Sequence, residues 1–445
     1  MQQKLTFKQL LTIGSMLFGL FFGAGNLIFP LMLGQQSGSN LYPAMIGFII
    51  TAVGLPLLGV NALGVTQRRD LYDLSSHIMP KLAKVFTLVL YLTIGPLFAI
   101  PRLATVSHEI GVAPFIDGSL SLFIFSILFF GIVWYFSLSK SNIMNIIGKY
   151  FNPAFLILIG ILIVLAFLNP MGEAASQTPV APYDARALTT GLQDGYNTMD
   201  AIASLAFGII VIQAIKQLGI KDTKTISRSV LQAGIVSSLL MVLIYAPLMW
   251  MGATQLGQFA PSTNGGEILA KIANHYLSGF GSVMLLITVT VACLKTGIGL
   301  ITSTAEILQV MYPNKFSYKT AVAVLIFVSV AVANFGLETI ISLSLPVLVF
   351  IYPFTIVIII LANLAPIFND HTRVYQWALI ATAPFALLDM INATPLATNG
   401  IFQPILTAAT AYVPFFTYGL GWVLPAVIAA LIAFFTTRNK YFLKV

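Results

Sequence analysis

Four polar side chains stand within otherwise apolar stretches of the chain: Asn26, Arg102, Asp200 and Lys295. Such side chains are costly inside a lipid bilayer, where they usually pair with one another or mark a path for ions or solutes. A lysine in such a place can gain or lose a proton when its surroundings change. If the apolar stretches cross a membrane, these residues therefore indicate ion or solute binding within it.

Enzyme chemistry has little support in the sequence. No His-Glu-x-x-His or Gly-x-Ser-x-Gly motif occurs, no phosphate-binding loop is present, and the four histidines fall at or beyond the ends of apolar stretches. The single Cys293 can form no internal disulfide, and one cysteine with four histidines argues against a structural zinc site. We therefore expect no enzyme, no cofactor and no metal other than a coupling cation.

The composition points to a membrane protein. Of the 445 residues, 58% are hydrophobic and only 8% are charged. A soluble domain carries roughly a quarter charged residues, so this chain has too little charge to cover a globular surface in water. The composition excludes a soluble enzyme, a disordered protein and a nucleic-acid binder.

Apolar stretches long enough to cross a bilayer, which takes about 20 residues, recur along the whole chain. They predict twelve transmembrane helices in one domain that covers residues 1–445. Their approximate ranges are 8–34, 41–65, 83–110, 118–138, 143–168, 190–215, 228–251, 278–309, 317–334, 338–363, 374–391 and 413–436. The first range is too long for a signal peptide and lacks a small-x-small cleavage site.

With the N-terminus placed in the cytoplasm, these helices divide the basic residues unequally. Of the 22 lysines and arginines, 18 fall on the cytoplasmic side, and only Arg186 and Lys271 fall outside. This is the positive-inside bias, and it accounts for most of the net charge of +8 without a nucleic-acid partner. It predicts a multi-pass protein of the plasma membrane with both termini in the cytoplasm.

The first apolar stretch contains residues that interrupt helices. Gly23, Ala24, Gly25 and Asn26 are followed by Pro30, and each glycine destabilises a helix interior by about 1 kcal/mol relative to alanine. Small residues also allow close helix packing in membranes. The clustering favours an unwound segment, and free backbone groups survive in lipid only beside a cavity or a ligand.

The sixth stretch has a comparable segment, at residues 195–200, with Ser204 and Gly208 beyond it. Interrupted helices at corresponding positions of two halves are typical of secondary transporter sites. Each half has five helices, and an odd number of crossings places the start of the second half on the opposite side of the membrane. The second half must therefore have the inverted orientation in the membrane. The expected fold class is an all-α 5+5 inverted repeat. Its parts are repeat one at about 8–168, repeat two at about 190–363, and additional helices at about 374–436.

Broken helices place positive N-terminal ends and negative C-terminal ends inside the membrane, and a zwitterionic amino acid can use both. We expect backbone N–H groups near Gly25 and Asn26 to bind its carboxylate. Carbonyl groups around 22–23 and 203–206 should face its ammonium group. No acid or arginine is expected at that depth, so the rest of the pocket should be neutral and apolar.

Four motifs of the chain resemble those of a known transporter family. They are FGAGNLIFP (22–30), GPLFAIPR (95–102), GYNTMD (195–200) and ACLKTGIGL (292–300). They resemble signatures of the branched-chain amino acid:cation symporters, the bacterial system II carriers, and the likeness covers essentially the whole chain. It implies uptake of leucine, isoleucine and valine with a cation, on the fold of the amino acid–polyamine–organocation and neurotransmitter symporters. A carrier for other small neutral amino acids is the alternative.

The resemblance also implies which residues form the site. The candidate substrate-binding residues are Phe22, Gly23, Ala24, Gly25, Asn26, Ser204, Ala206, Phe207 and Gly208. Phe22 and Phe207 are candidates for the pocket wall. A sodium ion, if sodium drives transport, would lie near Gly23, Asn26 and Thr296.

The eighth stretch departs from the common pattern of this fold. A small or hydroxyl residue followed by a threonine commonly contributes to a sodium site there, whereas this chain has Lys295 before Thr296. An ionised lysine in the middle of a bilayer costs about 2.5–3.5 kcal/mol on insertion scales. We hypothesise that its ammonium group replaces sodium and, with Gly23 and Thr296, couples transport to protons. The alternatives are a structural lysine and sodium coupling.

Arg102 and Asp200 are candidate gate residues, because an arginine near the outer end of the third helix could pair with an outer acid. A static packing pair of these two residues is the alternative.

A channel is disfavoured as the function. A channel needs a ring of repeated filter residues, whereas two helices interrupted at corresponding positions favour alternating access. The expected partners are a small neutral amino acid and the lipid bilayer, and the oligomeric state stays open.

Overall fold

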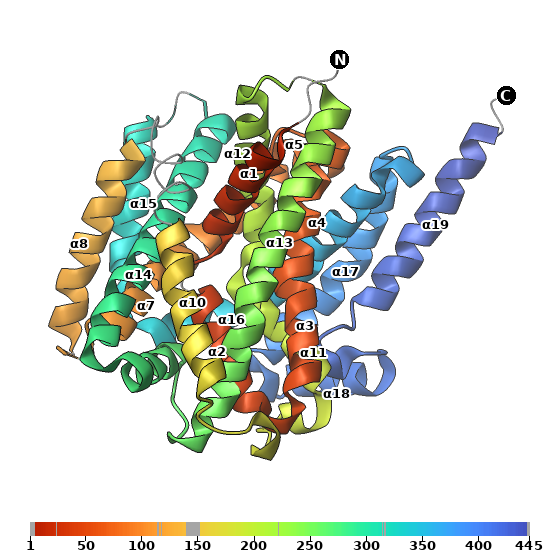
Figure 1. The fold of residues 1–445 in the computed structure, drawn as a ribbon. Helices are drawn as coiled ribbons and strands as arrows, with labels where there is room; N and C mark the ends of the chain where they lie inside the picture. The colour runs from red at the N-terminus through yellow and green to blue at the C-terminus, as the bar shows by residue number, and fades with distance from the viewer. Residues whose placement is uncertain are drawn as a thin grey trace.

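The computed structural model describes residues 5–23, 25–113, 115–116, 118–138, 152–220, 222–313, 315 and 317–442, and the regular elements among them are all helical (Figure 1). The earlier helices are α1 (Phe7–Phe21), α2 (Gly25–Ser37), α3 (Leu41–Ile49), α4 (Leu55–Thr66), α5 (Leu71–Ile78), α6 (Ala83–Leu92), α7 (Ala99–Gly111) and α8 (Ser119–Leu138). The later ones are α10 (Asn152–Leu168), α11 (Tyr183–Asp194), α12 (Asp200–Gln217), α13 (Thr223–Thr254), α14 (Gly265–Met311), α15 (Tyr318–Ala333), α16 (Leu337–Leu364), α17 (Thr372–Asn392), α18 (Phe402–Tyr412) and α19 (Val423–Phe442). The expected all-α class is confirmed.

Membrane-spanning candidates occur along the whole described chain. Among the described residues, eight helical segments are long and apolar enough to cross a membrane by length and composition. Shorter apolar helices accompany them at Phe7–Phe21, Leu156–Leu168, Tyr318–Ala333 and Val423–Thr437. Each expected range overlaps one of these segments, although the fifth begins within residues 139–151, which lie outside the described residues. The count of twelve crossings and the inverted repeat stay predictions.

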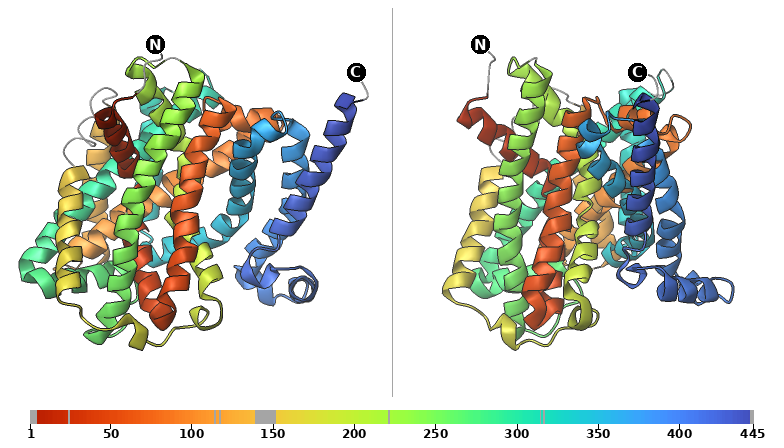
Figure 2. Two further views of the ribbon diagram at one scale, coloured as in Figure 1. Left: turned by 45° about the vertical axis from the view of Figure 1, so that its right-hand side comes forward. Right: turned by 90° about the vertical axis from the view of Figure 1, so that its right-hand side faces the viewer.

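The helices form a bundle in which neighbours come from distant parts of the chain (Figures 1 and 2). Helix α14 packs against α7, α13 packs against α1 and α2, and α12 packs against α4. Helix α19 lies at one edge of the bundle and contacts α17 (Figure 2). The N-terminal end of α1 and the C-terminal end of α19 lie at the same edge (Figure 1).

The first expected helix is interrupted at the glycine cluster, as predicted. Helix α1 ends at Phe21, Phe22 has an extended backbone with ψ of 95°, and α2 begins at Gly25. The N–H of Phe22 donates to the carbonyl oxygen of Phe18 at 2.8 Å, which closes the last turn of α1. The two half-helices therefore leave the C-terminal end of α1 and the N-terminal end of α2 inside the bundle. Ala24 lies outside the described residues.

The sixth expected helix is also interrupted, but not where free carbonyl groups were expected. The 3-10 segment η6 (Gly195–Thr198) leads to Met199 at φ +61°, and α12 begins at Asp200. The expectation for residues 203–206 is wrong, because they lie within the continuous helix α12. Alanine and leucine are good helix formers, whereas aspartate is favourable in a first helical turn. The local preferences therefore place the break before Asp200.

Glycines bring several of these helices into backbone contact. A Cβ atom at Gly34 of α2 would lie 1.8 Å from the carbonyl oxygen of Met249 in α13. At Gly252 of α13 it would lie 2.1 Å from the carbonyl oxygen of Leu31 in α2. Small residues commonly permit such close approach between membrane helices. The pair α2 and α13 is thus held at a distance that only glycine allows.

We expect Gly34→Ala to destabilise the protein, because the added methyl group must push α2 away from α13. Overpacking typically costs about 1–3 kcal/mol, so the melting temperature in detergent should fall by several degrees. Gly131→Ala in α8 is the matched control, since nothing lies within 4 Å of a Cβ atom there. Equal melting temperatures for the two variants would contradict this packing.

Candidate functional site

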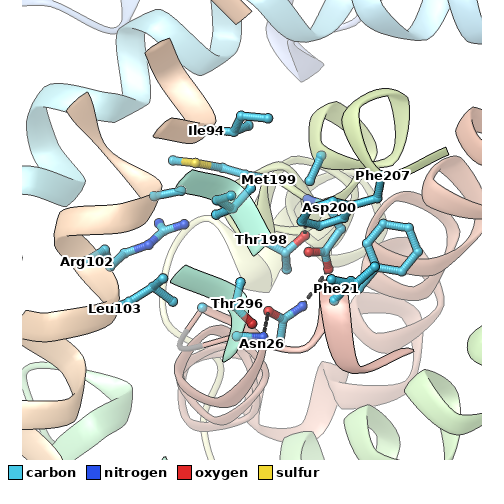
Figure 3. A pocket seen from close by; sticks show the side chains of 16 residues that line it. Phe21, Asn26, Ile94, Arg102, Leu103, Thr198, Met199, Asp200, Phe207 and Thr296 are labelled. Carbon is cyan, nitrogen blue, oxygen red and sulfur yellow. Dashed lines mark hydrogen bonds between the residues drawn. The ribbon is translucent and has the colours of Figure 1, made fainter. Parts of the chain in front are cut away.

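A buried pocket lies between the interrupted helices. It is small, with a cavity volume of about 30 Å³, and it lies among α1, α2, α7, α12 and α14 (Figure 3). Five of the residues expected at a binding or coupling site line it: Gly23, Gly25, Asn26, Phe207 and Thr296. Further lining residues include Leu20, Phe21, Ile94, Arg102, Leu103, Thr198, Met199, Asp200, Ala203 and Leu300. The breaks and the pocket therefore coincide.

Asn26 connects the break in the first helix to α12 and α13. Its side-chain oxygen accepts a hydrogen bond from the N–H of Gly23 at 2.9 Å. Its amide nitrogen donates to Asp200 Oδ2 at 2.5 Å and also to the hydroxyl of Tyr245. The side chain is only 2% exposed. Its side-chain amide is thus engaged within the protein, while the first N–H groups of α2 have no partner within their own helix.

Asp200 places a carboxyl group at the N-terminal end of α12. It is 3% exposed, and Tyr245 donates to its Oδ2 at 3.3 Å in addition to Asn26. The positive end of a helix favours a negative group, and these donors add to that effect. The pocket therefore contains an acid, and the expectation that no acid or arginine lies at this depth is wrong.

Arg102 enters the same pocket from α7. Its guanidinium nitrogen Nη2 donates to the carbonyl oxygen of Asn197 at 2.9 Å, and its Cζ lies 5.0 Å from the ring centre of Phe29. Among the described residues, the Arg102 and Asp200 side chains form no ion pair within 4.0 Å, although Figure 3 shows both around one pocket. A direct gate pair is therefore not formed in this structure, and the gate role stays a prediction.

Several of the expected substrate residues face away from the pocket. Phe22 packs its ring against Phe18 and Tyr245. Ser204 faces α4, where a Cβ atom at Gly59 would lie 1.8 Å from its hydroxyl oxygen, and Gly208 faces Leu63 of the same helix. Ala206 is buried but is not part of the pocket wall either. The geometry gives these four residues no direct part in binding within this pocket.

The face of α12 that does line the pocket carries Asp200, Ala203 and Phe207. These positions are spaced three and four residues apart, which places them on one side of a helix. Asp200 is the one charged residue of this face, and the other two positions are apolar like most of α12, so the sequence alone did not distinguish the face. The contribution of Thr198 and Met199 depends on the turn before α12, which no helical periodicity predicts.

The proposed coupling residues lie beside the first break. The hydroxyl of Thr296 donates to the carbonyl oxygen of Phe22 at 3.2 Å and to that of Ala292 at 3.3 Å. Lys295 is 1% exposed, and its Nζ lies 6.0 Å from the ring centre of Phe18. Thr296 and Gly23 line the pocket, whereas Lys295 does not. The break is thus in contact with the helix that carries the lysine, and the coupling roles stay predictions.

Solved structures share this arrangement of helices. Mhp1, a nucleobase-cation-symport-1 family transporter solved with bromovinylhydantoin bound, matches with a TM-score of 0.57 at 15% identity, over 96% of this chain and 92% of Mhp1. MhsT in complex with L-phenylalanine matches with a TM-score of 0.58 at 14% identity, over 98% and 99% of the two chains. These likenesses show the fold that this chain shares with the two solved proteins.

Sequence comparison gives the family. The model of the family described as "Branched-chain amino acid transport protein" matches residues 6–440. The branched-chain amino acid permease BrnQ of Lactobacillus delbrueckii subsp. lactis is 43% identical over 97% of this chain and 98% of its own length. BraB of Bacillus subtilis, also described as a branched-chain amino acid permease, is 40% identical over 98% and 97%. The chain belongs to the branched-chain amino acid transport protein family, and it is a multi-pass membrane transporter, not an enzyme.

We expect Asn26→Ala to destabilise the protein more than Tyr245→Phe. Loss of the Asn26 amide removes the partner of the Gly23 N–H and one donor to Asp200, and each unsatisfied buried group costs about 1–3 kcal/mol. Loss of the Tyr245 hydroxyl leaves the Asn26 bonds to Gly23 and Asp200 in place. Melting temperatures in detergent should decrease in the order wild type, Tyr245→Phe, Asn26→Ala. The reverse order would show that Asn26 does not hold the break together.

Proposed function

We propose that this protein imports leucine, isoleucine and valine by cation symport with alternating access, and that protons are the coupling cation. The observation that carries the transport proposal is the pocket at two interrupted helices in a chain of this family. Sodium-coupled symport of the same substrates, or transport of other small neutral amino acids, are the alternative functions.

The wall of the pocket supports a branched aliphatic substrate. Leu20, Ile94, Leu103, Met199 and Leu300 contribute apolar side chains to it. Burying the side chain of leucine or valine there contributes roughly 1.5–3 kcal/mol, because apolar surface leaves water. The same pocket also contains the charged side chains of Arg102 and Asp200, so it combines charged groups with an apolar wall.

The hydrogen bonds around the break provide a route from substrate to coupling site. Asn26 contacts Asp200 in the pocket wall and the N–H of Gly23 in the break. The neighbouring Phe22 carbonyl accepts from Thr296, which follows Lys295 in α14. A substrate that displaces Asp200 or Asn26 would therefore shift the break against α14. This supports coupling between the pocket and Lys295.

The proposed orientation places both termini in the cytoplasm of a bacterial cell, in the plasma membrane. It rests on the distribution of basic residues, and the shared edge of the α1 start and the α19 end supports an even number of crossings (Figure 1).

Purified protein in liposomes allows the coupling cation to be measured directly. We expect an inwardly directed proton gradient to drive accumulation of radiolabelled leucine, and a sodium gradient at constant pH to give no accumulation. Isoleucine and valine should compete, whereas arginine and glutamate should not. Accumulation under the sodium gradient alone, with indifference to the proton gradient, would refute proton coupling while leaving leucine transport intact.

We expect Lys295→Ala to abolish concentrative leucine uptake and to spare leucine exchange, because the variant keeps the substrate pocket but loses the group that carries the proton. Lys319→Ala is the matched control, since Lys319 is exposed on α15. It should accumulate leucine like the wild type. If Lys295→Ala still accumulates leucine against a gradient, the lysine is structural.

A further inference from the structure

The pocket contains two opposite charges that do not neutralise each other by contact. Arg102 and Asp200 are both 3% exposed, and both line the pocket. Among the described residues, their side chains make no ion pair within 4.0 Å. Asp200 accepts hydrogen bonds from Asn26 and Tyr245, but hydrogen bonds from neutral groups do not neutralise a buried charge, and burying a charge costs several kcal/mol. Two such charges around one cavity therefore indicate a ligand that carries both complementary charges.

The guanidinium group of Arg102 is only partly satisfied by the protein. Its Nη2 donates to the Asn197 carbonyl, whereas its Nη1 is buried without a hydrogen-bond partner. A Cβ atom at Gly25 would lie 3.4 Å from Nη2, so the group also lies against the first residue of α2. The N-terminal end of a helix attracts anions through its unpaired N–H groups. The arginine and this helix end thus form one positively charged corner.

The opposite corner is negative. The carboxyl group of Asp200 lies there, held by Asn26 and Tyr245. The C-terminal end of α1 at Phe21 also reaches this pocket, and the last carbonyl groups of a helix lack partners within it. Figure 3 shows Arg102 on one side of the cavity and Asp200 with Phe21 on the other. The corners are thus positioned for an anionic and a cationic group of one small molecule.

We infer that Arg102 binds the carboxylate of the transported amino acid and that Asp200 binds its ammonium group. The inference rests on the proposed function and adds two charged side chains to a site where backbone groups were expected to bind the carboxylate and the ammonium group. A guanidinium group can bind a carboxylate through two parallel hydrogen bonds, which also fixes its orientation. A ligand that lacks either charge leaves one buried ion unpaired, so the pocket selects zwitterions over amines and acids of the same shape.

Binding of three molecules with the same side chain separates the two roles. They are L-leucine, L-leucinol, which lacks the carboxylate, and 4-methylpentanoate, which lacks the amine. Isothermal titration calorimetry on the full-length protein in lipid nanodiscs measures each affinity for wild type, Arg102→Gln and Asp200→Asn. Arg373→Gln is the matched control, because Arg373 is exposed at the start of α17.

We expect Arg102→Gln to weaken leucine binding more than about 30-fold, because removing one partner of a buried charge pair commonly has an effect of that size. Its affinity for leucinol should stay within about threefold of wild type. Asp200→Asn should show the opposite selectivity, with leucine weakened and 4-methylpentanoate unchanged. Arg102→Lys keeps the charge without the planar donor pair and should weaken leucine by about tenfold with leucinol unchanged.

Several results would overturn the inference. A folded Arg102→Gln protein that loses leucine and leucinol equally, or keeps both, shows that the arginine does not contact the carboxylate. If Arg102→Gln does not fold, the same comparison with Arg102→Lys decides. Failure of the wild type to bind leucine would instead contradict the proposed function. The wild-type measurement therefore tests the function, and the selectivity of the variants tests the roles of Arg102 and Asp200.

Discussion

Backbone hydrogen bonding is the constraint on which this structure depends. A helix interrupted inside a bilayer exposes N–H and C=O groups that lipid cannot satisfy. Here the side chain of Asn26 accepts from the Gly23 N–H, and Thr296 donates to the Phe22 carbonyl, so the protein itself supplies partners at the break. The free helix ends that remain face a cavity in which a solute can replace water.

The same hydrogen bonds connect parts of the chain that are far apart in sequence. Asn26 and Asp200 are joined directly, and Tyr245 of α13 contacts both. Each of these groups is buried, and a buried polar group that loses its partner is costly. Movement of one interrupted helix therefore disturbs hydrogen bonds to the other and to α13. The proposed alternating access needs such a mutual dependence, because the pocket of a carrier opens on one side while it closes on the other.

The sequence predicted the first break well and the second less well, for physical reasons. Glycines beside Asn26 disfavour a helix locally, so residue type alone located that break. The second depends on Met199 in a left-handed turn, a conformation that its residue type does not favour. Ser204 and Gly208 were expected at the site, yet they pack against α4. Since α12 is apolar on nearly all sides, its composition does not show which face lines the cavity. The joint position of Arg102 and Asp200 depends on how α7, which packs against α14, faces the start of α12 across the pocket, and no local pattern contains that information.

Determination of the structure with leucine bound, by electron cryomicroscopy of the protein in nanodiscs, tests the binding site most directly. The density for leucine should lie between the end of α1, the start of α2 and the start of α12. Its carboxylate should contact Arg102 and its ammonium group Asp200. Leucine bound elsewhere, or a first helix that continues without interruption past Phe21 in the bound state, would contradict the role of the interrupted helices in substrate binding.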